Sequence, residues 1–358
     1  MSAVPNARVL TNATNDVAND VANNVANNVA MAPAASVGSQ VSRAAYWRHW
    51  ARNRPWLGSC VAALLAWGAT QWSGDAGGSG GLLTAALAFS AFTVLVSLGQ
   101  MLVISVGPGN ADLSIPSTIA LSGAAAMIVM NGDNAMLVPG LLAATVVGMA
   151  VGVFNFGLIR VLRIPPIIAT LAASLIVMSV AINVGRGLKV KPPPLFSDLM
   201  AMRVVGVPLV ALVALAVTLA IALMLERTVL GRSIAAVGQN RRAALLAGLR
   251  VERTRFMAYV ICAGLAGLTG ALIAGFSGGN SLDQGQEYLL MTIAVVVIGG
   301  TAVAGGRPSV PGIWGAAMFM FLLVALLNAV GAGPGLRTLL TGVIIIAVIV
   351  LASSRAER

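Results

Sequence analysis

Ten apolar segments occupy most of this chain, and many are close to the length that crosses a lipid bilayer. A transmembrane helix needs about 20 apolar residues. Several of the segments are shorter, so we expect the third and the eighth to be kinked or broken. The sequence therefore predicts an all-α, polytopic membrane protein with about ten transmembrane helices. The segments comprise residues 56–73, 82–105, 112–131, 136–159, 164–185, 206–225, 256–276, 288–304, 311–331 and 337–352.

The charged residues indicate how these helices are oriented. Only 9% of the residues are charged, against about 25% in soluble domains, and the net charge is +11. A cytosolic N-terminus places 17 of the 22 basic residues on the cytosolic side, where basic loops of membrane proteins remain. The charge thus indicates a positive-inside bias and not a nucleic-acid surface. We expect an even number of helices, both termini in the cytosol, and a multi-pass protein of the cell inner membrane.

The segment Arg227–Arg255, which we call the coupling loop, separates two apolar segments and contains seven arginines. A loop of this charge cannot lie in hydrocarbon, so we expect it to project into the cytosol. Ala243–Ala247 are good helix formers, and Gly248 follows in a position suited to end a helix. The loop is therefore predicted to present a short helix held between two membrane helices.

Seven short motifs stand out along the chain: Ala111–Ser114, Arg163–Leu171, Leu230–Arg232, Ala236–Asn240, Ala243–Leu249, Val295–Thr301 and Gly305–Arg307. Together they resemble the motifs of ribose-type ABC transporter permeases. The resemblance covers residues 82–351, roughly, and the motifs follow the family's order and spacing. One departure lies before the last motif, where Tyr288–Thr292 replace the acidic residues that the family usually has.

The resemblance implies a permease subunit of an importer that takes a sugar or sugar-like solute from an extracytoplasmic binding protein. The implied partners are ABC ATPase subunits and a second permease subunit, identical or homologous. ATP is then used by the ATPase, and this chain binds no cofactor. We expect Ala243, Ala244 and Gly248 to seat the short helix in a groove of the ATPase, with Gly238 and Asn240 shaping the turn before it. The full set of implied ATPase-coupling residues is Gly231, Val237, Gly238, Gln239, Asn240, Ala243, Ala244 and Gly248.

The segment Ser105–Ser114 interrupts the membrane helices, because Gly107–Gly109 with their central proline do not continue a helix. Asp112 and Ser114 can cap the helix that follows, near the positive end of its dipole. Alternatively, the broken backbone lines the translocation path, as half-helix ends do in transporters.

Further polar residues lie inside the apolar segments. They serve helix-to-helix hydrogen bonds, or they line the path of a neutral, hydroxyl-rich solute. A glycine series in segment 256–276 is expected to bring that helix close to a neighbour. The candidate path residues are Asp112, Asn155, Thr170, Ser174 and Asn183.

Other classes of protein fit the sequence poorly. An enzyme is not expected, because His49 is the single histidine and stands among interfacial tryptophans. A phosphate-binding loop is absent, since the lysines Lys189 and Lys191 lie in a proline-rich stretch. The cysteines Cys60 and Cys262 fall in apolar segments and support neither a disulfide nor a metal site. An ion-coupled transporter would depend on Asp112, and a permease for branched-chain amino acids or nucleosides remains the nearer alternative.

The chain divides into three parts. Residues 1–42 contain an imperfect Asn-Asp-Val-Ala repeat, and we interpret them as a disordered, low-complexity cytosolic tail. Residues 43–55 form a basic, tryptophan-bearing interfacial segment. Residues 56–354 are the predicted transmembrane permease domain, including the coupling loop 227–255.

Overall fold

A computed structural model describes residues 56–72, 79–187, 190–333, 335–337, 339–344 and 346. The predicted tail 1–42, the interfacial segment 43–55 with His49, and the end of the permease domain at 347–354 lie outside these described residues. The elements of the described part are helices, apart from one short antiparallel strand pair in which Arg203 faces Pro208, and irregular connections join them. The all-α prediction is therefore confirmed for this part of the chain.

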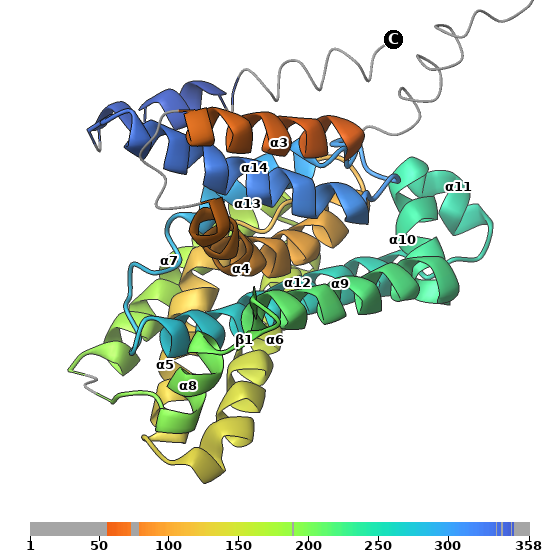
Figure 1. The fold of residues 1–358 in the computed structure, drawn as a ribbon. Coiled ribbons are helices and arrows are strands. Elements are labelled where there is room, and N and C mark those ends of the chain that lie inside the picture. Colours follow the sequence, from red (N-terminus) through yellow and green to blue (C-terminus); the bar gives the residue numbers. More distant parts are fainter. Residues whose placement is uncertain are drawn as a thin grey trace, which may run out of the picture. The chain divides into compact units, whose positions relative to one another are not determined.

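The elements follow the chain in an order that matches the apolar segments (Figure 1). They are α3 (Trp56–Trp72), α4 (Ser79–Ser105), α5 (Ile115–Met130), η1 (Asn134–Met136), α6 (Leu137–Val161), α7 (Pro166–Gly185), α8 (Pro194–Ala201), β1 (Arg203–Val204), β2 (Val207–Pro208), α9 (Leu209–Arg227), α10 (Val229–Gln239), α11 (Arg241–Leu246), α12 (Val251–Phe276), α13 (Tyr288–Ile298) and α14 (Val310–Ala329).

Within the described residues, six helices are long and apolar enough to cross a membrane: α4, α6 with the η1 turn before it, α7, α9, α12 and α14. The third and eighth apolar segments form shorter helices. Helix α5 has 16 residues and begins only after the Gly107–Gly109 interruption, and α13 has 11 residues and ends before Gly299. The expectation that these two segments depart from a full-length helix is confirmed.

Helices α4 and α12 form the centre of the bundle. In the most apolar part of α4, 89% of the residues are buried, and in α12 the share is 67%, against 28% in α7 and α9. Helix α12 packs against α4, α5 and α6. Helix α3, near the start of the chain, lies along α14 (Figure 1).

Close contact between α6 and α12 depends on glycine. A Cβ atom on Gly152 would lie 2.7 Å from the carbonyl oxygen of Tyr259, and a Cβ on Gly148 would overlap the carbonyl of Ala263. From the other side, a Cβ on Gly267 would overlap the carbonyl of Ala144. Small residues let helix backbones approach in this way. The predicted role of the α12 glycines in close helix packing is confirmed.

This packing predicts a large effect of side-chain volume at Gly148. Gly148→Val should destabilise the purified protein by about 1–3 kcal/mol, because the carbonyl of Ala263 cannot move away without separating the helices. Gly157→Val on the same helix is the control, since nothing lies within 4 Å of a Cβ there. Thermal unfolding can be followed by thiol-reactive dye, because Cys262 is buried. Equal melting temperatures for the two variants would contradict the close-packing account.

Candidate functional site

The coupling loop folds into two short helices with side-chain caps. The hydroxyl of Thr228 accepts a hydrogen bond from the Gly231 N–H at 3.1 Å and begins α10. The Asn240 side chain accepts from the N–H groups of Arg242 and Ala243, each at 3.0 Å, and begins α11. Gly248 follows α11 with φ +80°, a left-handed conformation that suits glycine. The predicted short helix and its end at Gly248 are confirmed.

At Gly238, in the last turn of α10, the backbone packs directly against the backbone at the end of α4 and of the turn after α13. Gly238 lies against the backbone of Ser105 and Gly306, leaving no room for a Cβ atom. The Gly306 N–H donates a hydrogen bond to the Ser105 carbonyl at 2.9 Å. A Cβ on Gly305 would lie 2.7 Å from the Cα of Gly107. We call Ser105, Gly107, Gly238, Gly305 and Gly306 the glycine junction.

The glycine junction changes the role expected for Gly238. The sequence suggested that Gly238 shapes a turn, but the structure places it inside α10 at the contact with the end of α4. Gln239 lies beside it and donates a hydrogen bond to the Gly306 carbonyl at 3.4 Å. Gly238 and Gln239 therefore connect α10 directly to the end of α4 and to the turn after α13.

Helix α11 turns a different face outward from the one that we expected. Ala244 is buried against Val237, Val251 and Leu249, so it cannot seat in a groove of another protein in this arrangement. Leu246 is 85% exposed instead, and Leu245 is 63% exposed. Sequence reasoning missed both leucines, because an apolar pair in a helix-forming run is usual for a core-facing position. Among the remaining expected coupling residues, Gly231 and Val237 are also buried, and Ala243 is exposed.

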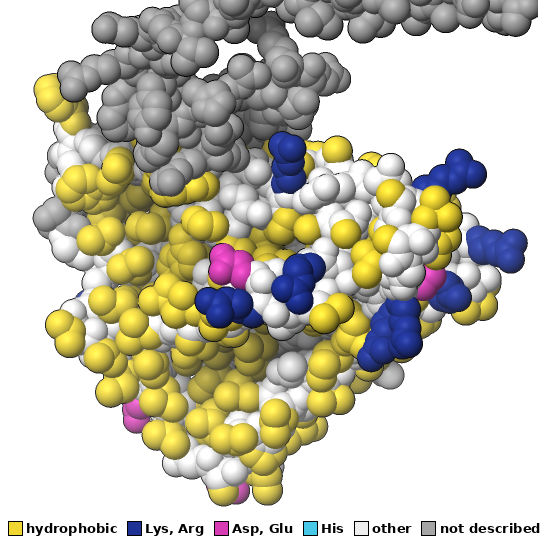
Figure 2. Space-filling view, turned by 90° about the vertical axis from the view of Figure 1, so that its right-hand side faces the viewer, with side chains coloured by type: hydrophobic (Ala, Val, Ile, Leu, Met, Phe, Trp, Pro, Cys, Tyr) yellow, Lys and Arg dark blue, Asp and Glu magenta, His cyan; other side chains and the backbone are white. Residues whose placement is uncertain are grey.

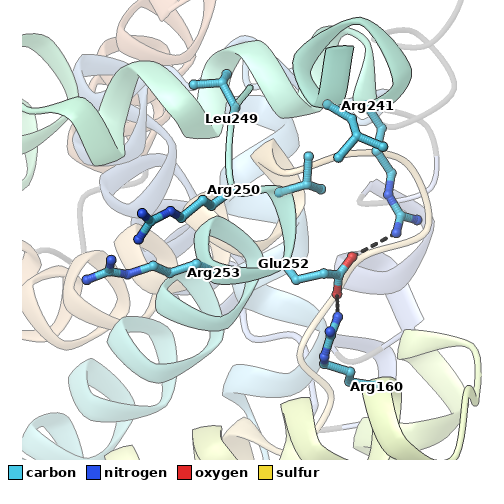
Figure 3. A pocket seen from close by; sticks show the side chains of 8 residues that line it. Arg160, Arg241, Leu249, Arg250, Glu252 and Arg253 are labelled. Carbon is cyan, nitrogen blue, oxygen red and sulfur yellow. Dashed lines mark hydrogen bonds and ion pairs between the residues drawn. The ribbon is translucent and has the colours of Figure 1, made fainter. Parts of the chain in front are cut away.

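Basic side chains stand out on the face that carries α10 and α11 (Figure 2). An open groove of about 550 Å³ runs between α11, the end of α6 and the start of α12. Glu252 lies in it and contacts Arg241 and Arg160, whereas Arg250 and Arg253 point together away from Glu252 (Figure 3). The residues lining this groove are Arg160, Arg241, Leu245, Leu249, Arg250, Val251, Glu252 and Arg253.

A buried polar cluster surrounds the connection between α4 and α5. The Asp112 carboxylate accepts hydrogen bonds from the Ser114 hydroxyl at 2.7 Å and from the Asn155 amide at 3.2 Å. The Asp112 N–H donates to the Gln100 side chain at 3.2 Å. Thr170 on α7 holds the same connection, since its hydroxyl accepts from the Leu113 N–H at 3.1 Å. The cluster ties α4, α6 and α7 to the interrupted segment.

The structure brings three of the five candidate path residues together: Asp112, Asn155 and Thr170. Ser174 is half-buried one turn after Thr170 on α7 and makes no hydrogen bond to the described residues of this cluster, and Asn183 is exposed near the end of α7. Asp112 also accepts from the Ser114 N–H at 2.9 Å, so it stabilises the start of α5 as the capping interpretation expected. The hydroxyl of Ser114 does not cap α5, because its oxygen accepts from the Asn155 amide at 2.7 Å while its proton goes to Asp112.

Sequence reasoning missed two further residues, Asn110 in the α4–α5 connection and Glu252 in the groove. Asn110 accepts hydrogen bonds from Arg255 at 3.2 Å and from the Tyr259 hydroxyl at 3.3 Å. Glu252 contacts three arginines. A signal for Glu252 was present in the sequence, since it is the only acidic residue between Arg227 and Arg255. Among the described residues, no group of three or more His, Cys, Asp or Glu side chains is placed to hold a metal ion.

Comparison with known proteins assigns the chain to a family. Residues 82–349 match the family described as branched-chain amino acid transport system, permease component. The fructose import permease protein FruF of Bifidobacterium longum is 32% identical over 259 residues, covering 68% of this chain and 69% of the relative. The ribose import permease protein RbsC of Escherichia coli K12 is 31% identical, covering 70% and 79%. The autoinducer 2 import system permease protein LsrC of Enterobacter sp. 638 is 30% identical, covering 74% and 76%.

No solved structure matched the chain significantly. The family match extends over most of the chain and includes the coupling loop, the interrupted α4–α5 connection and the glycine junction. The relatives are import permeases and not enzymes, and one of them is a probable ABC transporter permease from Sinorhizobium fredii. The chain therefore belongs to this family of transport-system permease components, and it is a membrane-spanning subunit of an ABC importer in the cell inner membrane.

Proposed function

We propose that this permease translocates a sugar or sugar-like solute, which an extracytoplasmic binding protein delivers and separate ATPase subunits drive. The observation that carries the proposal is the polar cluster at the α4–α5 connection, in which the Asp112 carboxylate is hydrogen-bonded to neutral groups and forms no ion pair with a described basic residue. Gln100, Ser114, Asn155 and Thr170 supply amides and hydroxyls there, and each is buried. Neutral donors and acceptors suit a hydroxyl-rich solute, whereas an amino acid would require paired charges.

Two buried polar atoms of this cluster support a path for solute. The Gln100 Nε2 and Asn155 Oδ1 atoms have no hydrogen-bond partner among the described residues. Buried polar groups are normally paired, and unpaired ones mark sites with a further role. The relatives named for fructose and ribose agree with a sugar, while the family description names branched-chain amino acids, which is the alternative substrate class.

The proposal includes ten transmembrane helices with both termini in the cytosol, formed by residues 56–354. Two contacts support the alternation of helix directions. Ser59 donates a hydrogen bond to the Gly312 carbonyl at 3.3 Å, so α3 and α14 begin at the same end of the bundle. The glycine junction places the end of α4, the end of α10 and the turn after α13 together. A further apolar helix, Gly335–Ile344, would return the chain to the cytosol.

We assign the ATPase contact to the outward face of α11. Leu245 and Leu246 offer exposed apolar side chains, and Leu245 lines the groove together with Arg250 and Arg253. An apolar centre with a charged rim is the usual anatomy of a protein interface. A second permease subunit completes the importer, and ATP is bound and hydrolysed by the ATPase alone.

Solute identity is tested with the importer reconstituted in proteoliposomes together with its ATPase and binding protein. We expect ATP-dependent uptake of radiolabelled D-ribose or D-fructose and none of L-leucine. Thr170→Val should lower the initial uptake rate about fivefold, since a hydrogen bond worth about 1 kcal/mol at the α4–α5 connection is lost. Ser174→Ala, on the same helix but outside the hydrogen-bonded cluster, should lower the initial uptake rate less than Thr170→Val does. Faster uptake of L-leucine than of either sugar would overturn the proposed substrate class.

The docking face is tested by ATPase co-purification. Leu246→Asp should weaken the complex by about 2 kcal/mol or more, because it puts an unpaired charge at the centre of the contact. Membrane abundance should stay normal, since Leu246 makes little contact within the chain. Arg242→Gln is the matched variant on the same helix, and it should cost about 0–1 kcal/mol, as exposed charges do. Normal co-purification of Leu246→Asp would show that α11 does not bind the ATPase.

A further inference from the structure

Glu252 binds three arginines that come from different parts of the chain. Its Oε1 atom accepts a hydrogen bond from Arg241 on α11 at 2.7 Å. Its Oε2 atom lies 3.1 Å from the Arg160 guanidinium at the end of α6 (Figure 3). The same atom lies 3.4 Å from Arg255 on α12. One carboxylate therefore joins the coupling loop to the cytosolic ends of two membrane helices.

Arg255 extends this connection to the interrupted segment between α4 and α5. Its Nη2 atom donates to the Asn110 side chain at 3.2 Å, and the Asn110 amide donates to the Gly107 carbonyl at 3.0 Å. The Arg255 side chain is only 11% exposed, so water competes little for these contacts. Asn110 stands two residues before Asp112, which anchors the buried polar cluster. Polar contacts thus run without a gap from α11 to the segment next to the proposed solute path.

Glu252 is the member of this connection whose negative charge no other residue of the coupling loop can supply. Three guanidinium groups face it, and it is the only acidic residue in the coupling loop. Without its charge, Arg160, Arg241 and Arg255 would repel one another, since like charges at short range are unfavourable. Helix α11 would then lose its ion-pair connection to α6 through Glu252, although the apolar contacts of Ala244 would still hold α11 and the glycine junction would still hold α10.

We infer that Glu252 is a positioning residue, which keeps the coupling loop in register with the α4–α5 connection, so that a displacement of α11 reaches the surroundings of Asp112. This inference rests on the proposed function, because it assumes that an ATPase displaces α11. It adds a second route between the loop and the membrane helices, made of charged and polar side chains, beside the backbone contacts of the glycine junction.

The test is the number of solute molecules transported per ATP hydrolysed, in proteoliposomes that hold the complete importer. The probe is whichever of radiolabelled D-ribose and D-fructose the wild type takes up faster. Glu252→Gln should lower this ratio about fivefold or more, as expected for loss of a coupling between two sites. ATP hydrolysis and ATPase co-purification should persist. Glu252→Asp, which keeps the charge, should retain more of the ratio, and Glu226→Gln, an exposed acid just before the loop, should leave it unchanged.

A second set of variants cuts the connection at its two ends. Arg241→Gln removes the contact on α11, and Asn110→Ala removes the contact at the α4–α5 connection. If the two contacts belong to one connection, the double variant should transport as much solute per ATP as the single variant with the lower ratio. The reason is that effects within one network are not additive. This set decides the question even where Glu252→Gln fails to reach the membrane.

Two results would overturn the inference: a wild-type ratio in Glu252→Gln, or effects of Arg241→Gln and Asn110→Ala that multiply in the double variant. Failure of the proposed function is a separate outcome. In that case the wild type itself would take up neither sugar, and the ratio would be undefined for every variant.

Discussion

Backbone contact at the glycine junction is the constraint on which the rest of this structure depends. Gly238 lies against Ser105 and Gly306 with no side chain between them. An interface of this kind cannot absorb a shift by changing rotamers, as a contact between long side chains can. A displacement of α10 must therefore move the end of α4 or separate the two. Tight backbone packing at this point makes the coupling loop part of the membrane domain.

The same principle governs the centre of the bundle. Glycines of α6 and α12 bring their backbones together, and α4 and α12 are the most deeply buried of the long helices in the described part of the chain. Helices α7 and α9 are mostly exposed, and lipid or a second permease subunit would cover them. The polar cluster at Asp112 lies where the buried α4 is interrupted, so a tightly packed core borders a segment of irregular backbone. Such a boundary is where half-helix ends form a path in transporters.

Local features of this architecture were readable from the sequence, and relations between distant residues were not. The interruption at Gly107–Gly109, the short helix ended by Gly248 and the close packing of the α12 glycines follow from the conformational limits of glycine and proline. The outward face of α11 could not be predicted from the sequence. In a membrane protein, apolar residues face lipid, the protein core or a partner, so hydrophobic periodicity does not tell which face is buried. The contacts of Glu252 with Arg160 and of Asn155 with Asp112 join residues far apart in the chain, and no local pattern specifies them.

The most direct test of this account is whether the coupling loop and the α4–α5 connection move as one body. Spin labels at Ala243 on α11 and at Pro108 in the connection, both exposed, report their separation in the assembled importer. We predict that this distance stays constant when ATP and vanadate are added, while the distance from Ala243 to a label at Arg203 changes. If instead the distance between Ala243 and Pro108 changes by about one helical turn, roughly 5.4 Å, the loop slides past the membrane helices. That result would contradict the account.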